Sequence, residues 1–485
     1  MKKILIIGAG VAGLSAGIYA QLNGFHAVVC ESHSVVGGCL SSWKREGYHI
    51  DNCIHWLTGT NPHSDEYPVW EALGVLGNND GEEIYIRNSL FTYCSGSQSV
   101  SLYRDIEKLR NELIELSSND KKEIDRYIDV IKAIQGLFGL AGENHDQRFG
   151  FVKSIVSVMK LLKYNSLSAS ELAERFESRM IKGFMISFLP DNFGALALAY
   201  VIANFCAGNG DLPMGGSELM AKRMTDRFTS LGGELILKKK AVKVNLNAGK
   251  ADSVSFSDGT VMDADYFILT PDPAIVFNGM LDAEMPKRLM KYYINDQPRF
   301  SAYQCAFGCD IDKPLFEGDI TIDIPPEYRK ELNAEYMMIR CDSHESYAPK
   351  GKSLIQTMIY CSKDEAKSWV EQKNSDVSGY KRRKKLVGDI TAEILFGYYP
   401  ELCGKIKCID VWTPATYKRY TGSQIGSFMS FAFTKKRLPL RIPGNIKELD
   451  NVFLAGQWLQ MPGGLPIAAI TGKCAVDSAV KHLNK

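Results

Sequence analysis

Residues 3–31 decide the fold, and their sequence is KILIIGAGVAGLSAGIYAQLNGFHAVVCE. The apolar run Ile4 to Ile7 is too short to span a membrane but suits a strand that is buried on both faces. Gly8, Gly10 and Gly13 follow it in the order G-x-G-x-x-G. We expect Gly8 to permit a tight turn, Gly10 to let the backbone approach a pyrophosphate, and Gly13 to let a helix lie close to the strand.

A helix and a second strand complete this unit. The first turn of the helix, which contains Ala12, is a predicted anion-binding site, and Gly24 ends the helix. The apolar residues 27–30 then form a second buried strand that ends in Glu31. An acidic residue at this position binds ribose hydroxyls and repels a ribose phosphate, which argues against NADP. The sequence therefore predicts a βαβ unit that binds a nucleotide.

Composition limits the class of protein. The chain has 485 residues, which corresponds to about three domains of ~150 residues each. Its 57 basic and 56 acidic residues leave a net charge of +1, so the chain lacks the positive field that would gather nucleic acid. The 12 cysteines form no C-x-x-C pair, so neither a zinc site nor a redox dithiol is indicated. We expect no nucleic-acid partner and a location in the reducing cytoplasm, with peripheral contact at the inner face of the membrane as a further expectation.

The segment after Glu31 carries a family resemblance. Gly37 and Gly38, the hydroxyl of Ser42, Gly47 and Asp51 are similar to the second signature of FAD oxidoreductases in the amine oxidase and phytoene desaturase superfamily. The resemblance implies non-covalent FAD, with Gly37, Gly38 and Ser42 among the residues that bind it. Cys39 stands where the family usually has arginine, so the arginine contact to the FAD phosphates does not carry over.

Residues 211–270 resemble the same superfamily. Glycines open a helix there, short strands follow, and Asp258-Gly259 predicts a hairpin turn. The resemblance implies that Val242 contacts the adenine.

The chain closes with residues 451–483, which resemble the C-terminal signature of phytoene desaturases, carotenoid isomerases and retinol saturases. The resemblance implies that the flavin ring lies against the glycines and the start of the last helix, where the helix dipole stabilises an anionic reduced ring. The implied contacts are Gly456, Gly464, Leu465 and Pro466.

Two inserted stretches separate these segments. We expect residues 62–207 to be helical, with amphipathic helices at 106–116 and 124–134. We expect residues 193–208, preceded by Pro190-Asp191 as a cap, to form a buried helix that lines an apolar cavity. The second insert mixes strands and helices.

Residues 148–164, RFGFVKSIVSVMKLLKY, form a basic amphipathic pattern. Such a helix either lies in a membrane interface or packs on its own protein, and the sequence leaves both alternatives open.

The predicted fold class is α/β: a Rossmann-type FAD-binding domain interleaved with an α+β substrate-binding domain and a helical insert. We assign residues 1–75, 209–280 and 441–485 to the FAD domain. Residues 76–208 and 281–440 form the substrate domain.

Two residues are candidates for catalysis. His55 should border the flavin in the related family, and its imidazole titrates near neutral pH, so it could transfer protons or only hydrogen-bond the loop. A metal site with His49 and Cys53 is the weaker alternative, since a fourth ligand is missing. Trp458 is either a lid over the ring or a core aromatic residue.

The sequence favours an FAD enzyme that desaturates, saturates or isomerises carbon–carbon double bonds of a long apolar molecule such as a carotenoid, retinoid or other lipid. The first alternative is an FAD-dependent amine oxidase. The second is a lipid-binding or hydratase-like protein that uses flavin without net redox change. No second dinucleotide site is evident, so the electron donor or acceptor is unidentified.

Overall fold

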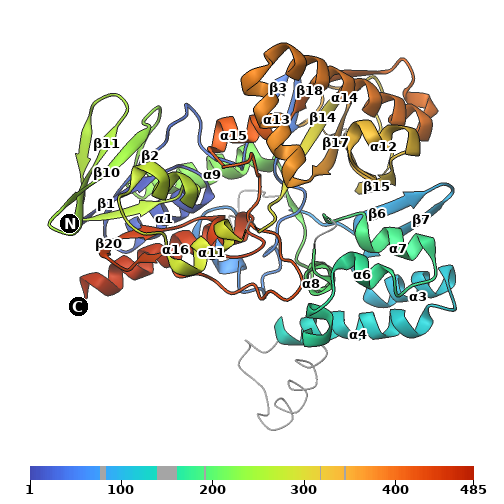
Figure 1. The fold of residues 1–485 in the computed structure, drawn as a ribbon, viewed down its shortest axis with the longest axis horizontal. Coiled ribbons are helices and arrows are strands. Elements are labelled where there is room, and N and C mark those ends of the chain that lie inside the picture. Colours follow the sequence, from blue (N-terminus) through green and yellow to red (C-terminus); the bar gives the residue numbers. More distant parts are fainter. Residues whose placement is uncertain are drawn as a thin grey trace, which may run out of the picture.

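The structure is a computed structural model that describes residues 1–76, 84–138, 161–190, 193–295, 297–316, 318–342, 344 and 346–484. Most of the basic stretch 148–164, namely residues 148–160, therefore lies outside the described residues. Figure 1 shows the chain arranged around two sheets, with the N- and C-termini near each other at one end.

The first sheet has six strands in the order β19-β20-β13-β1-β2-β9. Its strands are β1 (Lys3–Ile7), β2 (His26–Cys30), β9 (Glu234–Ile236), β13 (Tyr266–Leu269), β19 (Asn445–Ile446) and β20 (Leu449–Leu454). All neighbouring pairs are parallel except β19 and β20. The first strand of the chain is therefore a central strand, between β13 and β2, and it is buried on both faces as its apolar run predicts.

Alternate residues of β1 face two different layers. Ile4 and Ile6 join the core under the helices α1 (Val11–Leu22), α9 (Gly216–Ser230) and α16 (Leu465–Leu483). Leu5 and Ile7 join the core that includes the three-stranded antiparallel sheet β10 (Ala241–Asn247), β11 (Lys250–Phe256) and β12 (Val261–Asp263). The predicted turn at Asp258-Gly259 joins β11 to β12, and Gly259 has φ +84°.

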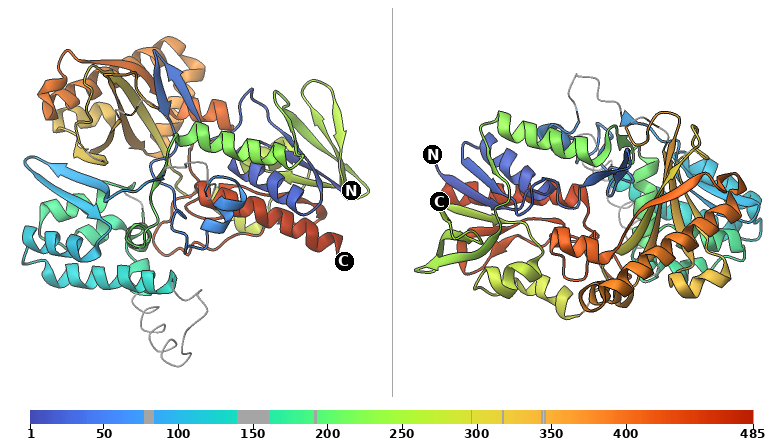
Figure 2. Two further views of the ribbon diagram at one scale, coloured as in Figure 1. Left: turned by 180° about the vertical axis from the view of Figure 1, so that it is seen from behind. Right: turned by 90° about the horizontal axis from the view of Figure 1, so that it is seen from above.

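Glycines allow α1 to pack tightly on its neighbours. A Cβ at Gly13 would lie 1.8 Å from the carbonyl oxygen of Gly8, so only glycine lets α1 lie this close to the turn after β1. A Cβ at Gly472 of α16 would lie 2.4 Å from the carbonyl oxygen of Ala12. Ser15 also donates a hydrogen bond of 2.7 Å to the carbonyl of Ala469. Figure 2 shows α1 and α16 side by side next to the first sheet.

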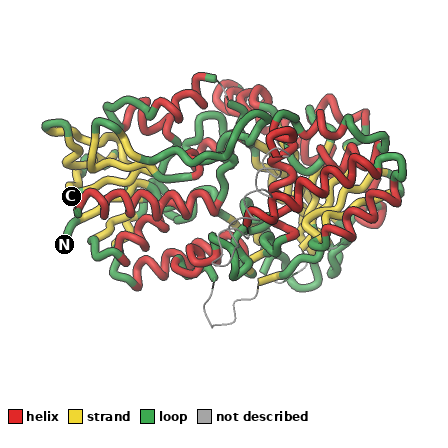
Figure 3. Tube along the Cα trace, turned by 90° about the horizontal axis from the view of Figure 1, so that it is seen from below, coloured by secondary structure: helices red, strands yellow, loops and turns green. Residues whose placement is uncertain are grey.

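The second sheet has seven strands in the order β18-β14-β17-β16-β15-β6-β7. They are β6 (Ser89–Ser95), β7 (Gln98–Tyr103), β14 (Ser301–Cys309), β15 (Asp319–Asp323), β16 (Tyr336–Asp342), β17 (Ser353–Cys361) and β18 (Ile406–Trp412). The parallel pairing of β15 with β6 joins strands from the two inserted stretches in one sheet. Figure 3 shows strands gathered at the two ends of the molecule, with helices and loops between them.

The hairpin β6–β7 corrects the expectation that residues 62–207 are helical. Val100 and Leu102 are fully buried and alternate with Ser99 and Ser101, which is the period of a strand. Gly96, with φ +58°, makes the turn. One face of the larger sheet is covered by α13 (Lys363–Ser375) and α14 (Val377–Tyr398), which share a core with β14 and β17.

The remaining part of the first insert is helical, as expected. It contains α3 (Ile106–Leu116), α4 (Lys121–Phe138), α6 (Ala169–Ala173), α7 (Arg179–Ile186) and α8 (Ala195–Cys206). Gly194 is the N-cap residue of α8, so Pro190 does not cap this helix, and Asp191 lies outside the described residues. None of the helices in the described ranges is long and apolar enough to cross a bilayer.

Short elements complete the chain. They are β3 (Ser42–Arg45), β4 (Tyr48–Asp51), α2 (Tyr67–Ala72), β5 (Ile84–Tyr85), β8 (Leu212–Pro213), α10 (Pro273–Ile275), η2 (Val276–Met280), α11 (Lys287–Ile294), α12 (Pro326–Leu332), η3 (Pro400–Leu402), α15 (Pro414–Thr421) and η4 (Gln457–Leu459). The β3–β4 hairpin follows the nucleotide unit in sequence but packs on the larger sheet, where Trp43 donates a hydrogen bond to Asp410 and meets the ring of Trp412 edge-on.

Candidate active site

A cavity of about 450 Å³ begins at the carboxyl ends of the parallel strands. Gly8, Glu31, Thr270 and Gly456, which follow β1, β2, β13 and β20, all line it. In open α/β sheets this edge is where ligands bind. Twelve of the predicted site residues line the cavity: Gly8, Gly10, Ala12, Glu31, Gly37, Gly38, His55, Gly456, Trp458, Gly464, Leu465 and Pro466.

The start of α1 is the anion-binding part of this cavity. Gly10 is the N-cap residue, and no side chain in the described part of the chain caps the helix. Val11 and Ala12 line the cavity, so the first turn presents backbone N–H groups to it. Gly10 forms a parallel bridge with Gly37, which places two glycine backbones at the same point of the wall.

Glu31 is buried at the end of β2. One of its carboxylate oxygens accepts a hydrogen bond of 2.8 Å from the N–H of Ala9, and the other accepts from the N–H of His33 at 2.9 Å. The hydroxyl of Ser32 donates to the second oxygen as well, at 3.0 Å. A carboxylate has about four acceptor positions, so Glu31 retains capacity for about one ribose hydroxyl.

Three predicted site residues do not line the cavity. Gly13 has the packing role described above. Ser42 forms a hydrogen bond of 2.7 Å with Nε2 of His49. The Val242 side chain is 43% exposed on β10, so its contact with adenine stays a prediction.

Asp51 fixes the loop that leads to His55. Its carboxylate accepts hydrogen bonds from the backbone N–H and the hydroxyl of Ser217, at 2.7 and 2.6 Å, and from the N–H of Cys53 at 3.0 Å. A Cβ at Gly216 would lie 2.1 Å from this carboxylate, which explains the glycine at the start of α9. The second signature therefore joins α9 to the cavity loop.

His55 lines the cavity, and its side chain is 22% exposed. Its Nδ1 lies 3.7 Å from Oδ2 of Asp319. Burial lowers the pKa of His55 below 6.5, and the nearby carboxylate opposes that shift only in part. The imidazole is therefore neutral at physiological pH, and its ring presents a hydrogen-bonding group to the cavity.

Two arginines donate hydrogen bonds to the carboxylate of Asp319, which lies next to His55. Arg340 donates two hydrogen bonds to Asp319, at 2.9 and 3.1 Å, and Arg87 donates two more at 3.4 Å. Burial raises the pKa of Asp319, but the two arginines outweigh it and hold this pKa well below its ordinary value. Arg340 also donates to the carbonyl groups of Ile54 and His55, at 2.8 and 3.1 Å. This cluster positions the loop that carries His55.

The metal alternative has no support in the geometry. Both ring nitrogens of His49 are engaged, Nε2 with Ser42 and Nδ1 with the carbonyl of Ser346 at 3.0 Å. Over the described ranges, no three histidine, cysteine or acidic side chains gather as a metal site would require.

The inner end of the cavity is mostly apolar. Its lining from α8, β17 and the loop before β19 includes Val201, Phe205, Met358, Tyr360, Phe428, Met429 and Phe433. Trp56 from the loop before α2 and Leu90 from β6 also line it. Helix α8 thus lines an apolar cavity, as expected from its sequence. Cys39 and Cys53 also line the cavity, and burial raises the pKa of the Cys39 thiol to about 12, so this thiol is protonated.

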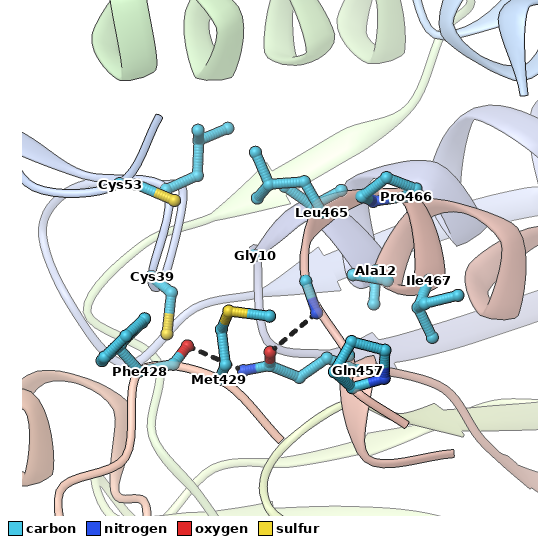
Figure 4. Close-up of a pocket in the computed structure, with 18 of the residues that line it drawn as sticks. Gly10, Ala12, Cys39, Cys53, Phe428, Met429, Gln457, Leu465, Pro466 and Ile467 are labelled. Atoms are coloured by element: carbon cyan, nitrogen blue, oxygen red, sulfur yellow. Dashed lines mark hydrogen bonds between the residues drawn. The ribbon is translucent and has the colours of Figure 1, made fainter. Parts of the chain in front are cut away.

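Gln457 is a site residue that the sequence analysis missed. Figure 4 shows its side-chain amide between two segments of the cavity wall. The amide donates a hydrogen bond of 3.2 Å to the carbonyl of Phe428 and accepts one of 3.2 Å from the N–H of Gly464. Gln457 therefore holds the start of α16 at a fixed position relative to the apolar wall.

Trp458 is both a cavity residue and a core residue. It is 5% exposed, and its ring meets Phe431 edge-on with centroids 5.6 Å apart. The buried guanidinium of Arg299 lies 5.9 Å from its ring centroid. These contacts fix the indole, so a mobile lid is not what the packing supports.

FAD fits the residues present. The lining of this one cavity includes the start of α1 and Glu31 as well as Gly464 and the start of α16. Gly10, Gly37 and Gly38 leave the backbone accessible at the pyrophosphate position. No lysine or arginine is found among the described lining residues, so the backbone N–H groups of α1 would have to recognise the FAD phosphates.

A family model described as flavin containing amine oxidoreductase matches residues 11–479. Among curated proteins, the chain is 22% identical to a chloroplastic prolycopene isomerase of Daucus carota, over 96% of this chain and 78% of that protein. It is 20% identical to an all-trans-retinol 13,14-reductase of Danio rerio, over 99% of this chain and 86% of that protein.

Two solved structures share the fold. An oxidoreductase from Methanosarcina mazei has a TM-score of 0.60 at 15% identity, covering 99% of this chain and 100% of that one. A putrescine oxidase with redesigned cofactor binding has a TM-score of 0.58 at 15% identity, covering 100% of this chain and 99% of that one.

Proposed function

The chain belongs to the flavin containing amine oxidoreductase family and is an FAD-dependent oxidoreductase, and on this premise we propose that it acts on carbon–carbon double bonds of a long apolar molecule. The reaction class is desaturation, saturation or isomerisation, and the substrate class is a carotenoid, a retinoid or another lipid.

One observation carries the proposal. The cavity continues from the nucleotide edge into a chamber lined mainly by aliphatic and aromatic side chains from α8, β17 and the loop around Phe428. Burial of apolar surface is the interaction that such walls offer, at about 25 cal/mol per Å². The names of the prolycopene isomerase and retinol reductase relatives support a polyene substrate.

The residues of this chain have three roles in such a reaction. Gly10, Ala12, Glu31 and Gly464 would hold FAD, which when bound supplies the acceptance or donation of a hydride. The apolar wall positions the hydrocarbon and excludes water. His55, held neutral by burial and fixed through Arg340, offers a hydrogen bond to the reacting region and a position for a proton.

Amine oxidation is the second candidate function, and Glu66 is the observation that favours it. Its carboxyl group lines the cavity, where it could pair with a substrate ammonium group. Burial raises the pKa of Glu66, however, which weakens it as a partner for a cation. The rings of Tyr360 and Phe428 are nearly parallel, with centroids 6.5 Å apart, so they form an aromatic pair in the cavity wall.

The decisive experiment uses the purified holoprotein under anaerobic conditions. Oxidised protein is mixed with a carotenoid or retinoid in detergent micelles, or with soluble amines, and the flavin spectrum is followed. Reduced protein is mixed with the same polyenes, and the products are separated to detect saturation or a change of double-bond geometry.

We expect a polyene to change the flavin spectrum or to be isomerised, and amines to have no effect. A protein whose flavin is reduced by amines and which transforms no polyene or lipid would contradict the proposal. The variant Gly10→Leu, which should lack FAD, is the control for reactions that do not need the cofactor.

A further inference from the structure

A group of exposed leucines and basic side chains lies outside the cavity. Leu438 is 49% exposed, Leu440 is 61% exposed and Leu162 is 56% exposed. Single exposed leucines are ordinary on protein surfaces, but here basic residues accompany all three. We name as the leucine–cation patch Leu162, Lys163, Lys435, Lys436, Arg437, Leu438, Leu440 and Arg441.

Two segments that are far apart in sequence form this patch. The N–H of Lys436 donates a hydrogen bond of 2.6 Å to the carbonyl of Asn165, and Lys435 forms an ion pair with Glu171 at 2.5 Å. The N–H of Gly194 donates to the carbonyl of Phe433 at 2.9 Å, so the same loop is also fixed to the start of α8. The chain at Asn165, which follows Leu162 and Lys163 closely in sequence, therefore lies beside the loop 435–441.

The patch has an excess of positive charge. Lys435 is partly neutralised by Glu171, but Lys163, Lys436, Arg437 and Arg441 form no ion pair with any described carboxylate. These cations alternate with or flank the leucines, which is the side-chain combination that binds an anionic lipid surface: leucines enter the acyl region while lysine and arginine meet the phosphates.

The patch is also the outer side of the cavity wall. Pro439, between the two exposed leucines, lines the cavity, and so does Phe433 at the start of the loop. A bilayer in contact with Leu438 and Leu440 would thus be separated from the cavity by a single layer of chain. A hydrocarbon dissolved in that bilayer has almost no aqueous concentration, so this position shortens its route to the cavity.

We propose that the leucine–cation patch docks the protein on an anionic lipid bilayer. The contact itself rests on the exposed side chains, and only its purpose, delivery of an apolar substrate, rests on the proposed function. A second copy of the chain is a poor occupant because two patches facing each other would bring like charges together.

The test is co-sedimentation of the full FAD-loaded protein with vesicles of phosphatidylcholine, with and without phosphatidylglycerol. The wild-type protein should bind the anionic vesicles at low salt and be released by high salt. The variants Leu438→Asn with Leu440→Asn, and Lys436→Glu with Arg437→Glu and Arg441→Glu, should each lower the vesicle affinity by about tenfold or more.

Matched controls lie on α14, at another surface. Val377→Asn with Leu386→Asn removes two apolar side chains that are 47% and 50% exposed. Lys381→Glu with Arg382→Glu and Lys385→Glu makes the same change of net charge as the patch variant. Both controls should bind anionic vesicles like the wild type, and all variants should keep their flavin spectrum.

Three outcomes would overturn the proposal. The first is wild-type protein that does not bind anionic vesicles at low salt, and the second is an equal loss of vesicle affinity in the control variants. The third is concentration-dependent self-association that the patch variants abolish, without any vesicle binding. Turnover of a polyene in detergent micelles is measured in parallel. If the turnover in micelles is unchanged in the patch variants, membrane docking and catalysis are separate properties. If no polyene is turned over while the wild-type protein still binds the anionic vesicles, only the proposed function fails.

Discussion

His55 lies 3.7 Å from Asp319, whose carboxylate oxygens already accept hydrogen bonds from Arg87 and Arg340. The carboxylate is therefore shared between two guanidinium groups and the imidazole. His55 next to this acid is not equivalent to the histidine–carboxylate pairs that raise a histidine pKa, because burial lowers the pKa of His55, Asp319 opposes that shift only in part, and the arginines lower the pKa further.

This arrangement predicts a stability change with pH. Because the pKa of His55 is below 6.5 in the folded protein, the unfolded chain binds the proton more readily, and stability falls as pH drops below about 6.5. The loss from this one residue is at most about 1.4 kcal/mol per pH unit. Urea unfolding of wild type and His55→Gln between about pH 7 and pH 5 should show the flatter curve for the variant.

Asp319 does not interfere with that measurement. Its pKa is depressed in the folded protein and ordinary in the unfolded chain, so both states stay ionised over this pH range, and its contribution is lost only at lower pH. Parallel curves for wild type and His55→Gln would show that the folded protein protonates His55 as easily as the unfolded chain.

Replacing Gly10 should remove FAD binding, whereas replacing Gly13 should lower the folding stability. Gly10 has φ −74°, and a Cβ there would lie 3.6 Å from the nearest atom, so Gly10→Leu should fold and lose FAD because its side chain fills the pyrophosphate position. In Gly13→Ala the Cβ would lie 1.8 Å from the Gly8 carbonyl oxygen, which should cost about 1–3 kcal/mol of folding free energy or more.

The measurement is urea unfolding of the apoproteins, together with FAD titration by fluorescence quenching. Full FAD retention by Gly10→Leu would disprove the position assigned to the pyrophosphate.

Glu31→Ala should weaken FAD binding by about 1.5–3 kcal/mol, the range for hydrogen bonds to a charged group. Because the carboxylate also accepts from Ala9 and His33, the variant should lose some folding stability without FAD as well. Glu31→Gln keeps one acceptor oxygen, so its FAD affinity should lie between the affinities of the wild type and Glu31→Ala. FAD affinity equal to wild type in Glu31→Ala would place the ribose elsewhere.

Gln457→Glu should loosen the wall of the cavity. The carboxylate still accepts from Gly464 but cannot donate to the carbonyl of Phe428, which it repels, and we expect a loss of about 1–3 kcal/mol of folding free energy. Thermal unfolding of the holoprotein measures this loss of folding free energy. The control is Gln98→Glu, which makes the same change at an exposed position on β7. Equal stability of Gln457→Glu and wild type would mean that the amide bridge contributes nothing.

The nucleotide unit could be predicted from sequence because its determinants are local. The turn at Gly8, the anion site at Ala12 and the acid at Glu31 follow each other within one βαβ unit, so spacing alone places them. Gly456 and Gly464 could be placed only through a family signature, yet they line the same cavity.

Other parts of the site depend on contacts that no local pattern contains. Asp319, Arg87 and Arg340 come from β15, a loop and β16, and nothing in their sequence neighbourhoods indicates that they meet. The β6–β7 hairpin was missed because Leu90 and Phe91 are both buried, which breaks the alternation at the start of the hairpin. The alternation of Val100 and Leu102 with serines, after Gly96, was the available signal.

The strand order of the first sheet has a consequence for how the protein is made. β1 pairs with the nearby β2, but its other neighbour is β13, where Ile4 pairs with Tyr266. Phe267 of β13 in turn pairs with Val452 of β20, so the sheet joins segments that are far apart in the sequence. Such long-range pairing slows folding, and the edge of β13 stays exposed until β20 pairs with it. Because Leu465 to Ile467 line the cavity together with Gly8 and Glu31, the cavity is complete only after β20 and α16 have joined the first βαβ unit.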